Sequence, residues 1–299
     1  MIRGVFRNRP AARFSIAWSF ITACPLLLSL PCFCMGAGEE LPQSAASQGL
    51  ASALCACTGR PESLVQNPSC LAFLENAEVQ FSSCSLFGLK ECALKTVTAG
   101  SPLPFGAWGC MAQSLGGTLY RENRLAFSFA FVSRNRIGGG ISARILQAQA
   151  AGYRTQTAAC MDLGWTVRVS EQWSWGAGIT NCTNSRMGRL QDRLPQCGRA
   201  GISFKPCPGI LVLAELDKDN RQALESRWGI ETRLSQGLVL RCGFGTRPDV
   251  FCLGIGAARG NLRMDVAFSD HPVLGATHHV SIGLFRRGQK DRQGKDRWP

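Results

Sequence analysis

His271, His278 and His279 are the side chains in this sequence best suited to acid–base or metal chemistry. Asp270 stands beside them, so the group has two interpretations. One is a metal or acid–base site, and the other, more common in proteins, is imidazoles that hydrogen-bond a loop. The sequence has no G-x-S-x-G and no H-E-x-x-H string, which leaves no motif for a serine nucleophile or a zinc protease. We therefore predict no catalytic residue and no metal site, and expect a protein that is not an enzyme.

Two further patterns suggest cofactor or metal binding at first sight. Gly254–Gly260 resembles a dinucleotide-binding loop, but such a loop needs a following helix to hold the phosphates, and Asn261–Ser269 alternates like a strand. Cys55-Ala56-Cys57 has no second cysteine pair or nearby histidine to complete four ligands. We predict no cofactor. Cys182 and Cys197 bracket the longest predicted loop, and we hypothesise that they form a disulfide there.

The positive charge of the chain is concentrated at its two ends. Its 299 residues carry a net charge of +13, with 45% hydrophobic and 18% charged residues. Residues 1–38 contain four arginines and no acid, and the last 14 residues hold six basic against two acidic side chains. A nucleic-acid-binding protein would place its basic residues on the folded body, among aromatic side chains. We therefore expect no nucleic-acid partner.

Residues 1–38 have the pattern of a secretory signal peptide. A basic region ends at Arg13, the mostly apolar run Phe14–Cys34 follows, and small residues close the segment at Gly36–Gly38. Cleavage is expected near Ala37 or Gly38. The sequence therefore predicts export from the cytoplasm.

The body of the chain alternates apolar and polar side chains with a period of two, which predicts β-strands. In residues 161–170, for example, Trp165 and Val167 share one face, while Asp162 and Arg168 share the other. A soluble sandwich also alternates, but these polar faces carry ionised and small residues in mid-strand, as in the interior of a barrel. In lipid, unpaired backbone groups are costly, so such a sheet closes on itself. We predict an all-β fold, a transmembrane antiparallel barrel in contact with outer-membrane lipid.

The predicted strands number about 14 and lie near 78–87, 91–100, 105–115, 123–133, 137–150, 158–169, 173–181, 198–205, 209–216, 225–234, 238–245, 249–258, 261–269 and 277–286. Short turns alternate with longer connections, as in barrels with periplasmic turns and outer loops. The predicted exception is a short first connection, Gly88–Lys90. The predicted organisation is a signal peptide at 1–38, a non-alternating segment at 39–77, the barrel at 78–286 and a polar tail at 287–299.

The charged faces inside this barrel are the candidate functional surface. The alternative, which we favour, is that these charges pair with one another and with the segment inside the barrel and so fill the lumen. The candidate lumen-lining residues are Asp162, Arg168, Glu215, Arg227, Glu231, Arg233, Arg241, Arg263 and Asp265.

Two strings resemble motifs of the fatty-acid-transporter (FadL-like) superfamily of outer-membrane proteins, particularly its PorV/PorQ-like branch. The string at 67–72, just before the first strand, is similar to N-P-A-G-L-A, and the string at 271–278 is similar to H-P-x-L-G-x-T-H. The matching residues of the plug-turn motif are Asn67, Pro68, Leu71 and Ala72, whereas Ser69 and Cys70 depart from it. The matching residues of the C-terminal loop motif are His271, Pro272, Leu274, Gly275, Thr277 and His278.

The resemblance implies a 14-stranded barrel in the bacterial outer membrane, with residues 39–77 folded into the lumen as a plug. Transporters of the superfamily move hydrophobic small molecules by a lateral route, whereas the PorV-like members serve the secretion of proteins. Two functions follow as alternatives: passage of hydrophobic small molecules, or docking and shuttling of secreted proteins.

Overall fold

The structure, a computed structural model, describes residues 37–188 and 192–286. The predicted polar tail and nearly all of the predicted signal peptide therefore lie outside the described residues. No helix among the described residues is long and apolar enough to cross a membrane.

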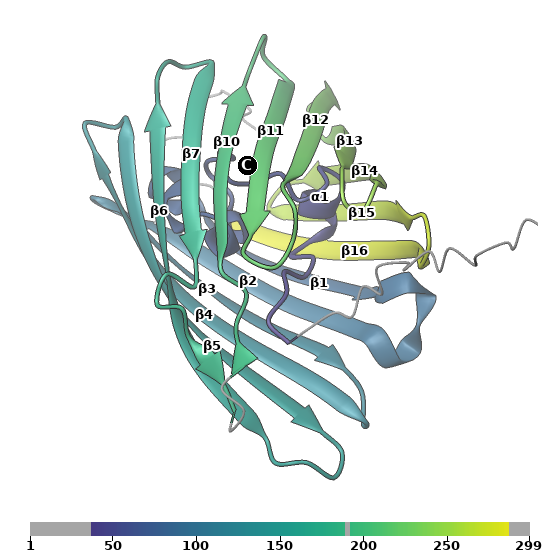
Figure 1. The fold of residues 1–299 in the computed structure, drawn as a ribbon. Coiled ribbons are helices and arrows are strands. Elements are labelled where there is room, and N and C mark those ends of the chain that lie inside the picture. The colour runs from purple at the N-terminus through teal and green to yellow at the C-terminus, as the bar shows by residue number, and fades with distance from the viewer. Residues whose placement is uncertain (1–36, 189–191, 287–299) are drawn as a thin grey trace, which may run out of the picture. The chain divides into compact units, whose positions relative to one another are not determined.

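Fourteen antiparallel strands form one closed barrel (Figure 1). Each strand pairs with its neighbours along the chain, and β1 closes the ring by pairing with β16 from Ala77↔Arg286 to Cys84↔His279. The strands of the wall are β1 (Ala77–Ser85), β2 (Ala93–Leu103), β3 (Gly106–Gly116), β4 (Tyr120–Ser133), β5 (Ile137–Ala150), β6 (Gln156–Arg168), β7 (Trp173–Thr180), β10 (Cys197–Phe204), β11 (Ile210–Asp219), β12 (Glu225–Ser235), β13 (Leu238–Gly245), β14 (Val250–Arg259), β15 (Leu262–His271) and β16 (Gly275–Arg286).

Apolar side chains face outward and polar side chains face the lumen, as the period of two requires. On β4, Phe127 and Phe129 are exposed on the outside while Ser128 between them is buried. On β15, Met264 and Val266 are exposed on either side of the buried Asp265. A soluble sandwich would bury the apolar faces instead. The predicted barrel is therefore confirmed.

The outer connections are shorter than predicted, because several strands extend into the predicted loops. The expected loop Gly116–Glu122 shrinks to the residues between Gly116 and Tyr120. The longest connection joins β7 to β10 and contains a two-stranded sheet of β8 (Arg186–Met187) and β9 (Asp192–Arg193). The prediction for the first connection was also wrong. It is longer than expected and contains two 3-10 turns, η3 (Leu86–Gly88) and η4 (Lys90–Cys92).

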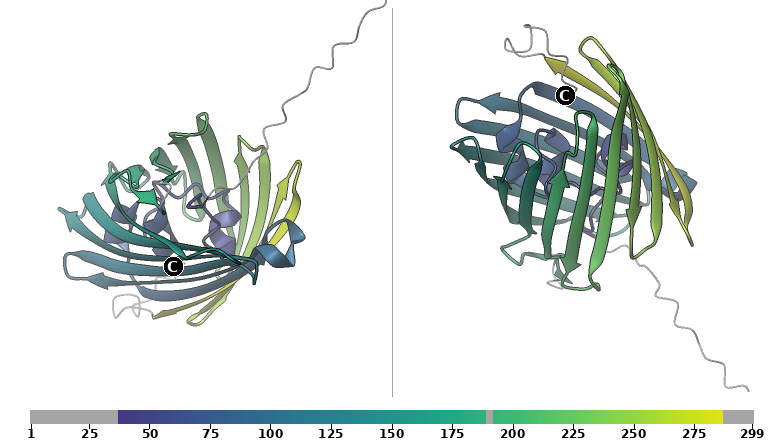
Figure 2. Two further views of the ribbon diagram at one scale, coloured as in Figure 1. Left: turned by 60° about the horizontal axis from the view of Figure 1, so that its bottom comes forward. Right: turned by 90° about the horizontal axis from the view of Figure 1, so that it is seen from above.

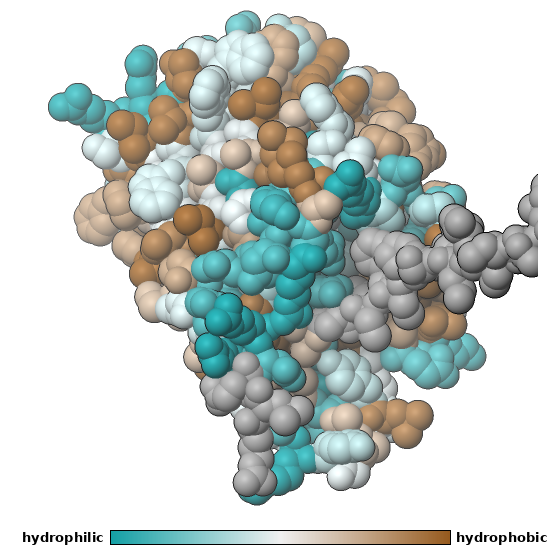
Figure 3. Space-filling model, viewed as in Figure 1, coloured by the Kyte–Doolittle hydropathy of each residue, from teal (hydrophilic) through white to brown (hydrophobic). Residues whose placement is uncertain are grey.

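On the lipid-facing sides of β4 and β5, apolar residues give way to polar ones toward the connection that precedes β4 and the connection that follows β5. Leu125 and Ile145 are exposed apolar residues, whereas Arg121 and Gln149, closer to the outer ends, are polar and exposed. This marks where the apolar belt ends on β4 and β5, which have 14 residues each and are the longest strands of the wall. Figure 3 shows hydrophobic residues over much of the side of the barrel, with hydrophilic residues gathered in one region of this face.

Residues 37–76 lie inside the ring of strands (Figure 2). They form α1 (Ala45–Gln48), η1 (Pro61–Val65) and η2 (Pro68–Phe73). Ser44 caps α1 by accepting a hydrogen bond from Ser47 N, and Asn67 caps η2 by accepting one from Ser69 N. We call residues 37–76 the plug.

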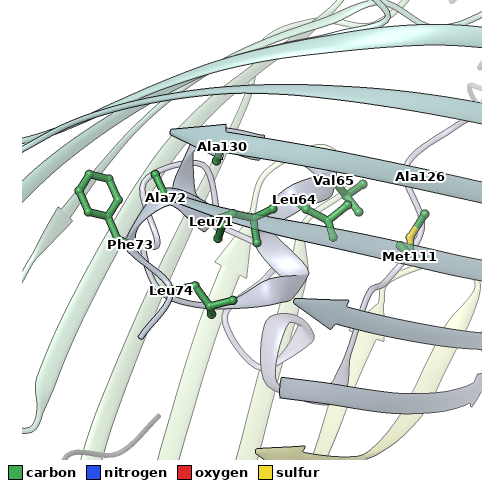
Figure 4. Close-up of a cluster of buried hydrophobic side chains, with 10 residues drawn as sticks. Leu64, Val65, Leu71, Ala72, Phe73, Leu74, Met111, Ala126 and Ala130 are labelled. Atoms are coloured by element: carbon green, nitrogen blue, oxygen red, sulfur yellow. The ribbon is translucent and has the colours of Figure 1, made fainter. Parts of the chain in front are cut away.

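The plug packs against the inner face of β3 and β4 through an apolar cluster. Leu64, Leu71 and Phe73 from the plug meet Met111 of β3 and Ala126 of β4 (Figure 4). All five side chains are buried. This contact fixes the plug on one side of the lumen, and ionic groups hold the other side.

Candidate functional site

The plug touches the wall where inward-facing residues are glycines. At five of these glycines a Cβ atom would come within about 2.5 Å of a plug atom, so the backbone or a side chain of the plug lies directly on the wall. These residues are Gly140, Gly164, Gly176, Gly178 and Gly243. They belong to β5, β6, β7 and β13, and we call them the glycine ring. No methyl-sized space remains between plug and wall at these points.

An ionic cluster on β10, β11 and β12 holds the start of the plug. Glu40 forms ion pairs with Arg199 at 2.7 Å and with Arg227 at 3.1 Å. Arg199 also pairs with Asp217 at 2.8 Å, and Arg227 with Glu225 at 2.8 Å. We call Glu40, Arg199, Glu215, Asp217, Glu225 and Arg227 the outer ionic cluster.

Glu40 is ionised in this setting. Burial opposes its charge, but the guanidinium groups of Arg199 and Arg227 outweigh burial and lower the pKa of Glu40 to about 2. Its second carboxylate oxygen accepts a hydrogen bond of 2.6 Å from Gln66 Nε2. Glu40 thus joins two wall strands to another part of the plug.

A second ionic cluster joins the plug to β1, β12, β13 and β15. Arg60 of the plug pairs with Glu231 at 2.7 Å, and Arg241 bridges Glu231 and Asp265 at 2.7 Å each. Arg263 continues the chain by pairing with Asp265 at 3.1 Å. We call Arg60, Glu78, Glu231, Arg241, Arg263 and Asp265 the inner ionic cluster. Arg263 also pairs with Glu78 at 2.5 Å.

The structure divides the nine predicted lumen-lining residues among several places. Glu215 and Arg227 belong to the outer ionic cluster, and Glu231, Arg241, Arg263 and Asp265 to the inner one. The remaining three stand apart and are described next. The two clusters pair most of their charges internally, so these residues hold the plug rather than line an open channel.

Asp162, Arg168 and Arg233 lie outside both clusters. Asp162 is fully buried, pairs with Arg144 at 2.6 Å and accepts a hydrogen bond of 2.7 Å from Asn181 N, where β7 ends. Arg168 lies 4.0 Å from the ring centre of Phe73, a cation–π contact with the plug. Arg233 is half-buried at the far end of β12.

Sequence reasoning missed several residues of these clusters. Arg199 and Glu78 lie at inward positions of predicted strands, so alternation could have identified them. Glu40 and Arg60 lie in the non-alternating plug, where no periodic pattern indicates which side chain reaches the wall.

Two apolar clusters line the lumen near the outer ends of the strands. The first, which we call the outer apolar cluster, contains Ala37, Leu146, Ala148, Ala158, Met187 and Leu194. Leu146 and Ala158 come from β5 and β6, and Met187 and Leu194 come from the β7–β10 connection. The second packs Leu41 of the plug with side chains of β1, β2 and their connection, namely Cys84, Leu86 and Leu94.

The plug-turn motif lies at the contact between plug and wall. Asn67 Nδ2 donates to the carbonyl oxygens of Cys55 at 2.6 Å and Trp165 at 3.1 Å, and to Thr166 Oγ1 at 3.2 Å. Pro68 begins η2, and Leu71 and Ala72 are buried in the apolar cluster against β3 and β4.

The C-terminal loop motif builds the β15–β16 turn. His271 ends β15, and its Nδ1 accepts hydrogen bonds from the backbone of Val273 and Leu274 within the Pro272–Leu274 turn. Gly275 begins β16, and Thr277 Oγ1 accepts a 2.8 Å hydrogen bond from Phe87 N of the first outer connection. His278 contacts the ring of Phe268. The motif thus attaches one outer turn to another.

The histidines and cysteines show no metal geometry. His279 is buried, with Nε2 3.1 Å from Ser269 Oγ. Within residues 37–188 and 192–286, no group of three or more His, Cys, Asp or Glu side chains could hold a metal ion. Cys182 and Cys197, the hypothesised disulfide, are both free thiols, and Cys197 Sγ contacts the Asp217 carboxylate instead.

No family model matches the chain, and no curated protein matches its sequence. Its fold is similar to solved structures. A FadL homologue of Pseudomonas aeruginosa has a TM-score of 0.60 at 9% identity, covering 84% of this chain and 100% of that one. The toluene transporter TodX of Pseudomonas putida has a TM-score of 0.60 at 11% identity, with 84% and 98% covered.

The toluene transporter TbuX of Ralstonia pickettii has a TM-score of 0.55 at 13% identity, with 82% of this chain and 98% of that one covered. At these identities the likeness concerns the fold. The chain has a FadL-like barrel fold.

Proposed function

We propose that this protein lies in the bacterial outer membrane and passes hydrophobic small molecules. The main support is the FadL-like fold, which it shares with structures described as toluene transporters. The exposed Phe, Trp, Leu and Ile residues around the barrel suit a lipid environment. A signal peptide at 1–38 and export before insertion are part of the same proposal.

The apolar outer lumen is the proposed entry site. Leu146 and Ala158 of the wall face Met187 and Leu194 there, so a hydrophobic solute would exchange water for apolar contacts. Below this level the plug lies directly on the glycine ring. A solute therefore needs the plug to shift, or a sideways exit through the wall as the resemblance implies. The ion pairs of the plug are proposed to hold it in place between passages.

The alternative role, docking of secreted proteins, gains no support. Its partners would meet either the long outer loops or the periplasmic rim of the barrel. Most of the outer loops are short because the strands extend into them, which leaves the periplasmic rim as the place for such contacts. The PorV/PorQ-like branch remains a prediction from the strings at 67–72 and 271–278.

Uptake by intact cells tests the proposed function. The chain is expressed in bacteria lacking their own FadL-type transporter, and initial uptake of labelled toluene and of a labelled fatty acid is measured. Leu146→Arg places a charge inside the outer apolar cluster and should reduce uptake to the vector level. Gln147→Arg, on the exposed outward side of the same strand, is the matched control and should retain uptake.

Heat-modifiable gel mobility must show that both variants and the parent chain insert as folded barrels. A folded parent barrel with no uptake above vector would contradict the proposal. Capture of secreted proteins by the same barrel would then favour the docking role.

A further inference from the structure

Residues 39–43, which remain after the proposed removal of residues 1–38, reach from one wall of the lumen to the opposite one, and we call them the strap. On one side, Arg124 of β4 donates to the Glu39 carbonyl oxygen, and Gln113 Nε2 of β3 donates to the Pro42 carbonyl oxygen at 3.0 Å. On the other side, Glu40 pairs with β10 and β12. In the closed strand order, β3 and β12 lie across the ring from each other.

The strap contacts one of the apolar clusters of the outer lumen, where Leu41 packs with Cys84, Leu86 and Leu94. The strap therefore borders a place where a hydrophobic solute would first bind.

The strap is held unevenly. On the β3–β4 side its backbone carbonyl oxygens accept hydrogen bonds from wall side chains. On the β10–β12 side the hold is the Glu40 side chain, whose carboxylate receives two guanidinium groups and the Gln66 amide. Hydrogen bonds to charged groups stabilise more than neutral ones. Loss of the Glu40 charge should therefore detach the strap from β10 and β12, while its backbone hydrogen bonds to β3 and β4 remain.

We propose that the strap closes the outer mouth of the lumen and that Glu40, paired with Arg199 and Arg227, is the latch that keeps it closed. This inference depends on the proposed function only in assuming that the strap, when open, admits a hydrophobic solute. The closed strap and its latch are testable without any transport.

Cys84 is a native reporter of strap position. Its thiol is buried on the inward face of β1, in contact with Leu41 of the strap. Cys207 is exposed in the turn after β10 and serves as the reference thiol. The experiment measures the rates at which a water-soluble maleimide modifies both cysteines of the detergent-solubilised full chain, by peptide mass spectrometry.

Glu40→Gln removes the latch charge. Glu225→Gln is the matched control, because Glu225 also pairs with Arg227 at 2.8 Å but belongs to β12 and does not touch the strap through this pair. We expect about a tenfold faster modification of Cys84 in Glu40→Gln, because loss of a charge-assisted pair shifts a local opening equilibrium by that order. Glu225→Gln should change the rate less than about twofold, because Arg227 still pairs with Glu40 at 3.1 Å and with Asp217 at 3.3 Å. Cys207 should react equally in all proteins.

Glu40→Asp keeps the charge on a shorter side chain and should restore part of the protection of Cys84. Heat-modifiable mobility verifies that each variant is a folded barrel. Equal Cys84 rates in the parent, Glu40→Gln and Glu225→Gln would overturn the latch, and so would equal acceleration by both substitutions. If the latch result holds while the parent chain takes up no hydrophobic solute, the proposed function fails and the strap inference stands.

Discussion

Asn67 of the plug lies directly against Gly164 of β6, so close that a Cβ atom at position 164 would overlap its Oδ1 atom. The same Asn67 side chain donates to the backbone oxygen of Trp165 at 3.1 Å. A plug residue and a wall glycine therefore fit each other atom to atom. The plug is seated on the wall at this point, rather than held loosely within a wide lumen.

Gly164→Ala should unseat the plug at this contact. The added methyl group needs space that Asn67 occupies, and overpacking of this kind costs about 1–3 kcal/mol. Gly198→Ala on β10 is the control, because a Cβ atom there meets nothing within 4 Å. Denaturant unfolding of the barrel in detergent measures both. Equal free energies of unfolding for the two variants would show that the plug can move away from position 164 without loss of stability.

Arg241→Met should destabilise the barrel strongly. Arg241 bridges Glu231 and Asp265 at 2.7 Å each, and all three side chains are buried, so its loss leaves two carboxylates short of a partner. Removal of one member of a buried ion pair costs about 3–5 kcal/mol. Arg259→Met, at an exposed position of β14, is the comparison and should be near neutral. A loss below about 1 kcal/mol for Arg241→Met would mean that water replaces the pairs.

Trp165→Arg tests the lipid-facing surface. Trp165 is exposed on the apolar outer face of β6, beside Val167 on the same face, and a charge inside the apolar belt costs up to about 2–4 kcal/mol in a membrane barrel. Thr157→Arg, also outward on β6 but near its outer end, should cost about 0–1 kcal/mol. Unfolding in phospholipid bilayers measures the difference. Equal costs at both positions would argue against a membrane around this face.

Acid should open the strap only at very low pH. The pKa of Glu40 is lowered to about 2 from an ordinary 4.5, chiefly because two guanidinium groups outweigh the effect of burial. A lowered pKa means that the stabilisation by Glu40 is complete above about pH 4.5 and disappears as the pH falls through about 2. Hydrogen exchange of strap amides, corrected for intrinsic rates, should therefore match at pH 7 and pH 5. Full exposure of the strap already at pH 5 would contradict this assignment.

The alternation of side chains predicted the strands well, and the loops poorly. Strand β5 was predicted at 137–150 and has these bounds, because both of its faces alternate to their ends. The loop expected at 116–122 is mostly strand, because Tyr120 to Glu122 have polar or mixed side chains beyond the apolar belt. The alternation of apolar and polar side chains ends at the edge of the membrane, because only there does lipid require apolar residues. The backbone hydrogen bonds between strands continue beyond that edge.

The sequence by itself determined the barrel. Its period of two gives each strand one apolar and one charged face, and a sheet of such strands in a membrane is stable only when it closes on itself. It also indicated which charges face inward, such as Arg241 and Asp265, since inward and outward positions alternate along each strand. Only the tertiary structure decided what those charges meet. Glu40 and Arg60 reach wall residues far away in the chain, and no local pattern encodes the path of a plug across a lumen.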